Sequence, residues 1–81
     1  MIRLIIALFS LVFCSSCMLQ YAAGLSQIQQ EKYEQATYNF SVALSKDPKN
    51  PEIYFARAFS RGSMEQYSGA ISDLTKAIRL D

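Results

Sequence analysis

The feature that most constrains this 81-residue chain is a segment that occurs twice. Residues 33–47 read YEQATYNFSVALSKD, and residues 67–81 read YSGAISDLTKAIRLD, so the two copies are in register when Tyr33 is aligned with Tyr67. A period of about 34 residues is typical of stacked helical repeats, in which each unit buries its apolar face against its neighbours. The repeat therefore predicts an all-α chain.

Each copy has the spacing of an amphipathic helix. The first copy places four apolar residues at i, i+4, i+7 and i+8, which is one face of an α-helix: Ala36, Phe40, Ala43 and Leu44. The equivalent positions of the second copy match them in size and polarity: Ala70, Leu74, Ala77 and Ile78. The alanines allow a facing helix to approach closely, and the bulky residue between them fills the remaining space.

Four helices are predicted, near residues 18–30, 34–46, 51–64 and 68–80. Pro48 ends the second, because proline disfavours the α conformation of the residue before it. Asn50 then begins the third as a capping residue, with Pro51 at the first helical position and Glu52 near the positive end of the helix dipole. If the N-terminus is retained, the first helix would run back into the apolar segment that precedes it.

With this period and these small and bulky positions, the sequence resembles the tetratricopeptide repeat family, whose unit is a helix–turn–helix. The resemblance implies two units of an α-solenoid, residues 17–50 and 51–81. Its packing positions are Gly24, Tyr33, Ala36, Phe40, Ala43, Pro48, Tyr54, Ala58, Tyr67, Ala70, Leu74 and Ala77. In these terms Gly24 and Ala58 are the small residues of the two first helices.

The chain departs from the family pattern at several polar positions. Glu31 and Glu65 replace the turn glycine between the paired helices, and Gln27 and Arg61 replace a tyrosine late in each first helix. Gln20 also stands where an aromatic residue is usual. The first unit is therefore the more degenerate of the two.

In this family the first helix of each pair lines a concave surface on which other proteins or peptides usually bind. Carried over by register, that surface comprises Tyr21, Leu25, Ile28, Glu52, Phe55, Phe59 and Ser63. The resemblance thus implies a non-catalytic scaffold for protein–protein interaction. Two interpretations of Phe55 and Phe59 remain open. Aromatic residues at helical spacing favour core packing against the neighbouring unit, and the alternative is an apolar groove with these two side chains as anchors.

The N-terminus has the pattern of a targeting segment. Residues 4–13, LIIALFSLVF, carry no charge, and Arg3 precedes them. This run of about ten residues is short for a bilayer span, which needs about 20. However, no charged residue follows until Glu31, so residues 4–25 are an alternative signal anchor that would make the chain an integral membrane protein. Residues 1–16 are accordingly expected to be a signal peptide or a membrane anchor.

Cys17 follows an apolar run and two small residues, and this arrangement resembles the lipobox of bacterial lipoproteins. The resemblance implies lipidation at Cys17, although Cys14 stands where leucine is usual. A lipidated Cys17 would tether the repeats to a membrane surface. We therefore expect the protein in the cell envelope, associated with a membrane, or in the periplasm or medium after secretion.

Composition excludes several other functions. Eight Lys and Arg are nearly balanced by seven Asp and Glu, so a nucleic-acid partner is not expected. The absence of histidine removes the usual general base and the commonest metal ligand. The Cys14-x-x-Cys17 pair lies among apolar residues without cations or further ligands, so no metal or cofactor is expected. Asp73, Ser72 and Glu65 are the only grouped polar candidates, and we expect them on a solvent-facing side without a catalytic role.

Two further expectations concern assembly. Two repeats are fewer than the three that such arrays normally need, so the chain is expected to be part of a longer array or to self-associate through the C-terminal repeat. The alternative function is the N-terminal part of a larger envelope assembly factor or enzyme.

Overall fold

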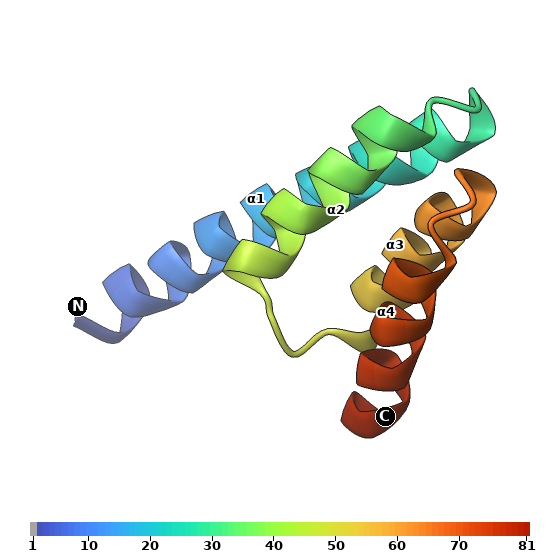
Figure 1. Ribbon diagram of the computed structural model, residues 1–81. Coiled ribbons are helices and arrows are strands. Elements are labelled where there is room, and N and C mark those ends of the chain that lie inside the picture. The colour runs from blue at the N-terminus through green and yellow to red at the C-terminus, as the bar shows by residue number, and fades with distance from the viewer. Residues whose placement is uncertain (1) are drawn as a thin grey trace.

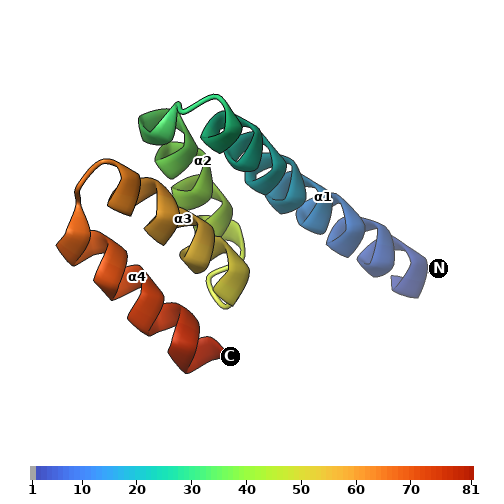
Figure 2. The ribbon, with the colours of Figure 1, turned by 90° about the vertical axis from the view of Figure 1, so that its right-hand side faces the viewer.

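The computed structural model describes residues 2–81, with side chains described from residue 16 onward. In this part of the chain all regular structure is helical, in the order α1 (Ile2–Gln29), α2 (Tyr33–Lys46), α3 (Pro51–Ser63) and α4 (Tyr67–Leu80). Figures 1 and 2 show that α1 and α2 form one antiparallel pair and α3 and α4 a second, with α2 packed against α3 between the pairs. The predicted all-α architecture of two helix–turn–helix units is confirmed.

The predicted bounds of α2, α3 and α4 are confirmed to within one residue. The first helix ends at Gln29, close to its predicted end, but begins at Ile2 rather than near residue 18, which corresponds to the alternative of a continuous first helix. Residues 1–16 are predicted to be a signal peptide or a membrane anchor. Of these residues only Ser16 has a described side chain, so the prediction lies outside the described range. Within that range no helix is both long and apolar enough to cross a membrane.

The linker between the two units is fixed by local hydrogen bonds. The Asp47 N–H donates to the Ala43 carbonyl at 2.9 Å and closes α2. The Asn50 side chain accepts from the Glu52 N–H at 3.0 Å, with Pro51 as the first helical residue, so the predicted capping signal is confirmed. The Tyr54 hydroxyl donates to the Pro48 carbonyl at 3.0 Å, which ties the linker back to α3.

The turn inside each unit places a glutamate in the left-handed region. Glu31 has φ of 59° and Glu65 has φ of 63°. These are the positions at which the family pattern has glycine, and the geometry gives the reason, since an L-residue with a Cβ costs about 1 kcal/mol or more there. The following N–H groups still close the helix ends: Lys32 donates to Gln27 and Gln66 to Arg61, both at 2.8 Å. Helix packing therefore imposes the turn on a residue that does not favour it.

The core lies where α1, α2 and α3 meet. Its buried residues are Cys17, Ala36, Phe40, Ala43, Leu44, Ile53 and Ala56, with Tyr21, Ile28 and Tyr54 packed against them. Phe40 is fully buried, and its ring lies 5.9 Å from that of Tyr21 between ring centroids. The same ring fills the space above Gly24, where an added Cβ would lie 2.8 Å from both Cδ1 and Cζ of Phe40. Gly24 is therefore the close-approach point of α1 and α2.

The second unit is covered less completely. Ala58, Ala70 and Ala77 are buried between α3 and α4, but Leu74 is only half-buried. Tyr67 was predicted to be a packing residue and is instead mostly exposed, whereas its equivalent Tyr33 is half-buried. The difference arises because α3 covers the outer side of α2, and no described helix covers the corresponding side of α4.

Candidate partner-binding groove

The first helices of the two units enclose an open groove of about 440 Å³, which we call the first-helix groove. It is lined by Tyr21, Leu25, Ile28, Glu52, Phe55, Ala56 and Phe59. The first three come from α1 and the rest from α3, so residues far apart in the chain meet because α1 and α3 both pack on α2. Six of the seven residues assigned to the binding surface by register are brought together here.

Ser63 and Ala56 mark the differences from the register assignment. Ser63 does not line the groove, and its hydroxyl donates to the Phe59 carbonyl at 2.9 Å on its own helix. Ala56, which sequence reasoning did not assign to this surface, is buried in the core and also forms part of the groove floor.

Phe55 and Phe59 are, with Tyr21, the aromatic side chains of the groove, and their exposure bears on the core-packing interpretation. Phe55 is 63% exposed and Phe59 57% exposed. The expectation that they pack as core against the neighbouring unit is therefore wrong for the described residues. Their spacing of one helical turn puts them on the same side of α3, which borders α1 across this groove. Two aromatic rings thus face solvent next to the buried Ala56 and the half-buried Tyr21 and Ile28.

Glu52 supplies the only charge in an otherwise apolar lining. Partial burial raises the pKa of the Tyr21 phenol above its ordinary value, and the nearby negative charge of Glu52 raises it further. Tyr21 is consequently neutral at physiological pH and keeps its O–H as a hydrogen-bond donor at the edge of the groove. The site offers apolar contact area with one anionic group beside it.

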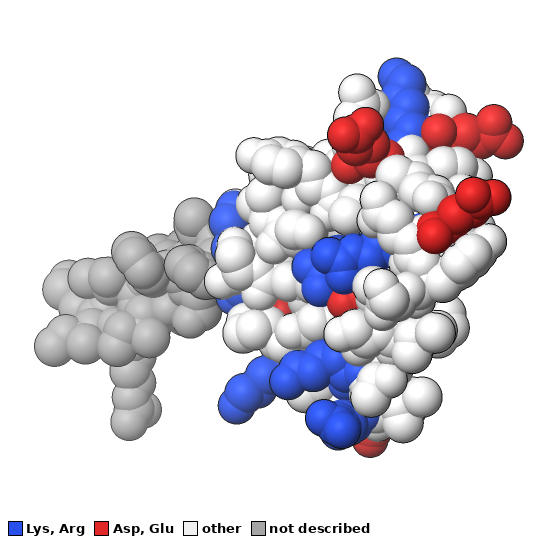
Figure 3. Space-filling model, in the orientation of Figure 1, with Lys and Arg blue, Asp and Glu red and all other residues white. Residues whose placement is uncertain are grey.

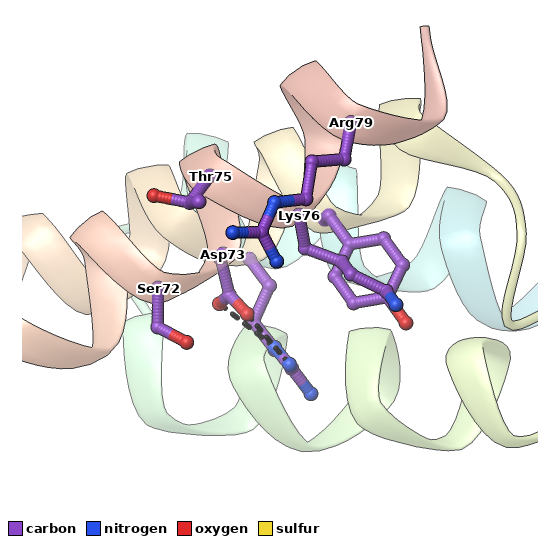
Figure 4. A pocket seen from close by; sticks show the side chains of 7 residues that line it. Ser72, Asp73, Thr75, Lys76 and Arg79 are labelled. Atoms are coloured by element: carbon purple, nitrogen blue, oxygen red, sulfur yellow. Dashed lines mark hydrogen bonds and ion pairs between the residues drawn. The ribbon is translucent and has the colours of Figure 1, made fainter.

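A second cavity, of about 360 Å³, is lined by Arg57 and Asp73, which form an ion pair (Figure 4). Asp73 is 3% exposed, and its carboxylate accepts from Arg57 Nε at 2.9 Å and Nη2 at 2.7 Å. Arg61 Nη1 donates to the same carboxylate at 2.9 Å. The expectation that Asp73 faces solvent is wrong, because two arginines of α3 draw its side chain inward. With both of its oxygens occupied by guanidinium groups, Asp73 is a structural acceptor and not a general base.

This ion-pair cluster joins three helices. The Arg57 Nη1 donates to the Ser41 hydroxyl of α2 at 3.2 Å, and its guanidinium lies 5.7 Å from the centre of the Tyr54 ring. Lys76 and Arg79 line the same cavity from α4. Figure 3 shows most basic side chains in the middle and lower parts of the face in view, and most acidic ones near its top, where one basic side chain also lies.

The repeat register contains a signal for this cluster that sequence reasoning did not use. Gln27 and Asn39 of the first unit are hydrogen-bonded, Nδ2 of Asn39 to Oε1 of Gln27, at 2.7 Å. One repeat further along the chain, the same two positions are Arg61 and Asp73. Each unit therefore has one polar contact at the same place, as a neutral amide pair in the first and as an ion pair in the second.

Cys17 lies in the core, with its thiol 3.5 Å from the Ala43 carbonyl, to which it donates. Next to it, Lys46 Nζ donates to the Ser16 hydroxyl at 2.5 Å. Across residues 16–81, no three His, Cys, Asp or Glu side chains lie close enough together to hold a metal ion.

Comparison with known proteins identifies one family. A sequence model described as TPR repeat matches residues 24–64, which is just over half of the chain. The matched region begins at Gly24 in α1, contains α2 and α3 entirely, and so includes the close-approach point, most of the core and most of the first-helix groove. No curated protein gave a significant match.

Proposed function

Because this chain belongs to the tetratricopeptide repeat family, whose members serve as protein–protein interaction scaffolds, we propose that it binds a segment of another protein in the first-helix groove. The observation that carries the proposal is the pair Phe55 and Phe59, more than half exposed beside the buried Ala56 in an apolar groove. Large aromatic side chains at the centre of a concave apolar surface are the usual anchors of a protein interface.

The lining also defines the chemistry of the bound segment. Apolar side chains of the partner would fill the space between the rings of Tyr21, Phe55 and Phe59. The carboxylate of Glu52 favours a basic residue next to these apolar anchors, since an unpaired charge at the edge of a desolvated surface gains from an opposite charge. The expected ligand is an amphipathic segment, helical or extended, with one Lys or Arg beside its apolar face.

Removing both anchors should abolish binding and leave the fold intact. A peptide library displayed on phage and selected against the full chain is expected to enrich segments of this chemistry. In a variant with Phe55→Ala and Phe59→Ala, their affinity should fall at least about thirtyfold per removed ring, because hot-spot truncations cost about 2 kcal/mol or more. Isothermal titration calorimetry with a synthetic copy of an enriched peptide measures the change.

Tyr38→Ala provides a matched control, because Tyr38 is an exposed aromatic of α2 that lies outside the groove. It should leave peptide affinity unchanged. The free energy of unfolding of the groove variant should stay within about 0.5 kcal/mol of wild type, as for other exposed positions. A groove variant that binds as tightly as wild type, or that unfolds, would overturn the proposal.

We further propose that residues 1–16 hold this scaffold at a membrane or direct its export. The support is the uncharged run at residues 4–13 behind Arg3 and the lack of charge up to Glu31. Burial of the Cys17 thiol against Ala43 supports a retained anchor over lipidation, because a thioether-linked lipid has no room between α1 and α2.

Mass spectrometry of the mature N-terminus, on protein recovered from the membrane and secreted fractions, tests this placement. An intact Met1 is expected for an anchor, an acylated Cys17 for a lipoprotein, and an unmodified cleaved terminus for secretion. Recovery of the intact chain only in the soluble cytosolic fraction would contradict all three.

A further inference from the structure

The outer side of α4 carries an apolar stripe that repeats a covered stripe of α2. We call it the tail face, and it consists of Tyr67, Ile71, Leu74 and Ile78, at i, i+4, i+7 and i+11. The equivalent residues of α2 are Tyr33, Thr37, Phe40 and Leu44, and α3 packs on that helix. The difference in exposure is large, since Leu44 is 6% exposed and Ile78 is 75% exposed.

The outer side of α1 shows the complementary difference. Ile53 and Ala56 of α3 are buried in the core cluster together with Ala43 and Leu44 of α2. One repeat earlier in the chain, their equivalents are Leu19 and Ala22, which with Ala23 and Ser26 form what we call the head face. Leu19 is 71% exposed, whereas Ile53 is fully buried. These four residues lie on the side of α1 opposite to Cys17 and Gly24, which face α2.

A hollow lies at the position where the head face of another chain would pack if the repeat continued with the same register. It measures about 270 Å³ and is lined by Pro51, Glu52, Phe55, Ala77, Ile78 and Asp81. Three of its apolar members, Phe55, Ala77 and Ile78, are the equivalents of Tyr21, Ala43 and Leu44, the surface on which Ile53 and Ala56 pack within the chain. The hollow is thus the equivalent, on the second unit, of the surface on which α3 packs in the α2–α3 junction.

We propose that a second copy of this chain places its head face on the tail face, with Leu19 in this hollow, and so repeats the junction between α2 and α3. The side chains of residues 16–30 carry no charge that would oppose Lys76 and Arg79 beside the tail face. The junction between two chains has one polar contact fewer than the α2–α3 junction inside a chain. There Ser41 and Arg57 are hydrogen-bonded, whereas Thr75 and Ala23 stand at the equivalent positions between chains. Because the contact is head-to-tail, a dimer keeps one free head face and one free tail face. Further chains can therefore add at both ends, and the assemblies grow longer as the protein concentration rises.

Sedimentation of the full chain in a mild detergent tests the proposal. The wild type should exceed the mass of one chain, increasingly so as its concentration rises. Leu19→Glu blocks the head face and Ile78→Glu the tail face, and each variant alone should sediment as a monomer. An equimolar mixture of the two retains one intact junction per pair of chains, so it should form a dimer and nothing larger.

Tyr38→Glu, a charge placed at an equally exposed position of α2, should associate like wild type. Circular dichroism should show unchanged helix content in all three variants, since the substituted side chains are mostly exposed. Several outcomes would overturn the proposal. These are a wild type that stays monomeric, a Leu19→Glu chain that still dimerises tail to tail, a mixture that stays monomeric, or association that survives both substitutions and so runs through another surface.

Discussion

A Gly24→Ala variant is expected to lose about 1–3 kcal/mol of its free energy of unfolding, the usual cost of overpacking a core. The new methyl group would overlap the ring of Phe40, which is fully buried and cannot move without displacing other core residues. Alanine is more favourable than glycine in a helix by up to about 1 kcal/mol. The measured loss is therefore the steric cost minus this gain in helix propensity. Urea denaturation followed by circular dichroism gives the value.

Gly62→Ala is the control with the opposite sign. Gly62 lies inside α3 with an ordinary negative φ, and the nearest atom to an added Cβ is the Ala70 Cβ at 4.0 Å, a normal contact. This variant should gain about 0.5–1 kcal/mol from helix propensity alone. If both variants shift stability in the same direction, then the Gly24–Phe40 contact does not limit the approach of α1 and α2.

The regular part of the fold could be predicted because it depends on local chemistry and on a repeat that is visible in one sequence. Asn50, Pro51 and Glu52 specify the start of α3 through groups adjacent in the chain. The spacing of Ala36, Phe40 and Ala43 specifies a face, and the period of the repeat specifies what that face meets. None of these inferences required knowledge of a distant contact.

Side-chain contacts between helices were harder to predict than the helices themselves. The burial of Asp73 could not be predicted from residue spacing, because it depends on two arginines of the preceding helix that extend to its carboxylate. The exposure of Phe55 and Phe59 was also undecided, since periodicity assigns a residue to a face but does not say whether another helix covers it. Register grouped six of the groove residues correctly, but it also assigned Ser63, which does not line the groove.

Replacing Asp73 with asparagine is expected to cost about 2–3 kcal/mol of the free energy of unfolding. The substitution leaves Arg57 and Arg61 facing an amide without its negative charge. Breaking a fully buried pair costs about 3–5 kcal/mol, and the value here is lower because both arginine side chains retain contact with water. Ser72→Ala, at the neighbouring exposed position, should change stability by less than about 0.5 kcal/mol.

The first unit suggests how the loss can be reversed. Gln27 and Asn39 hold the equivalent position with a neutral hydrogen bond, so Arg61→Gln added to Asp73→Asn reproduces that pair in the second unit. The double variant should recover part of the loss, because it removes one uncompensated charge and supplies a partner for the new amide, while Arg57 keeps its bond to Ser41. A double-mutant cycle in urea measures this coupling. Losses that simply add would mean that Arg61 and Asp73 do not act as a pair, and that Arg57 alone holds the carboxylate between α3 and α4.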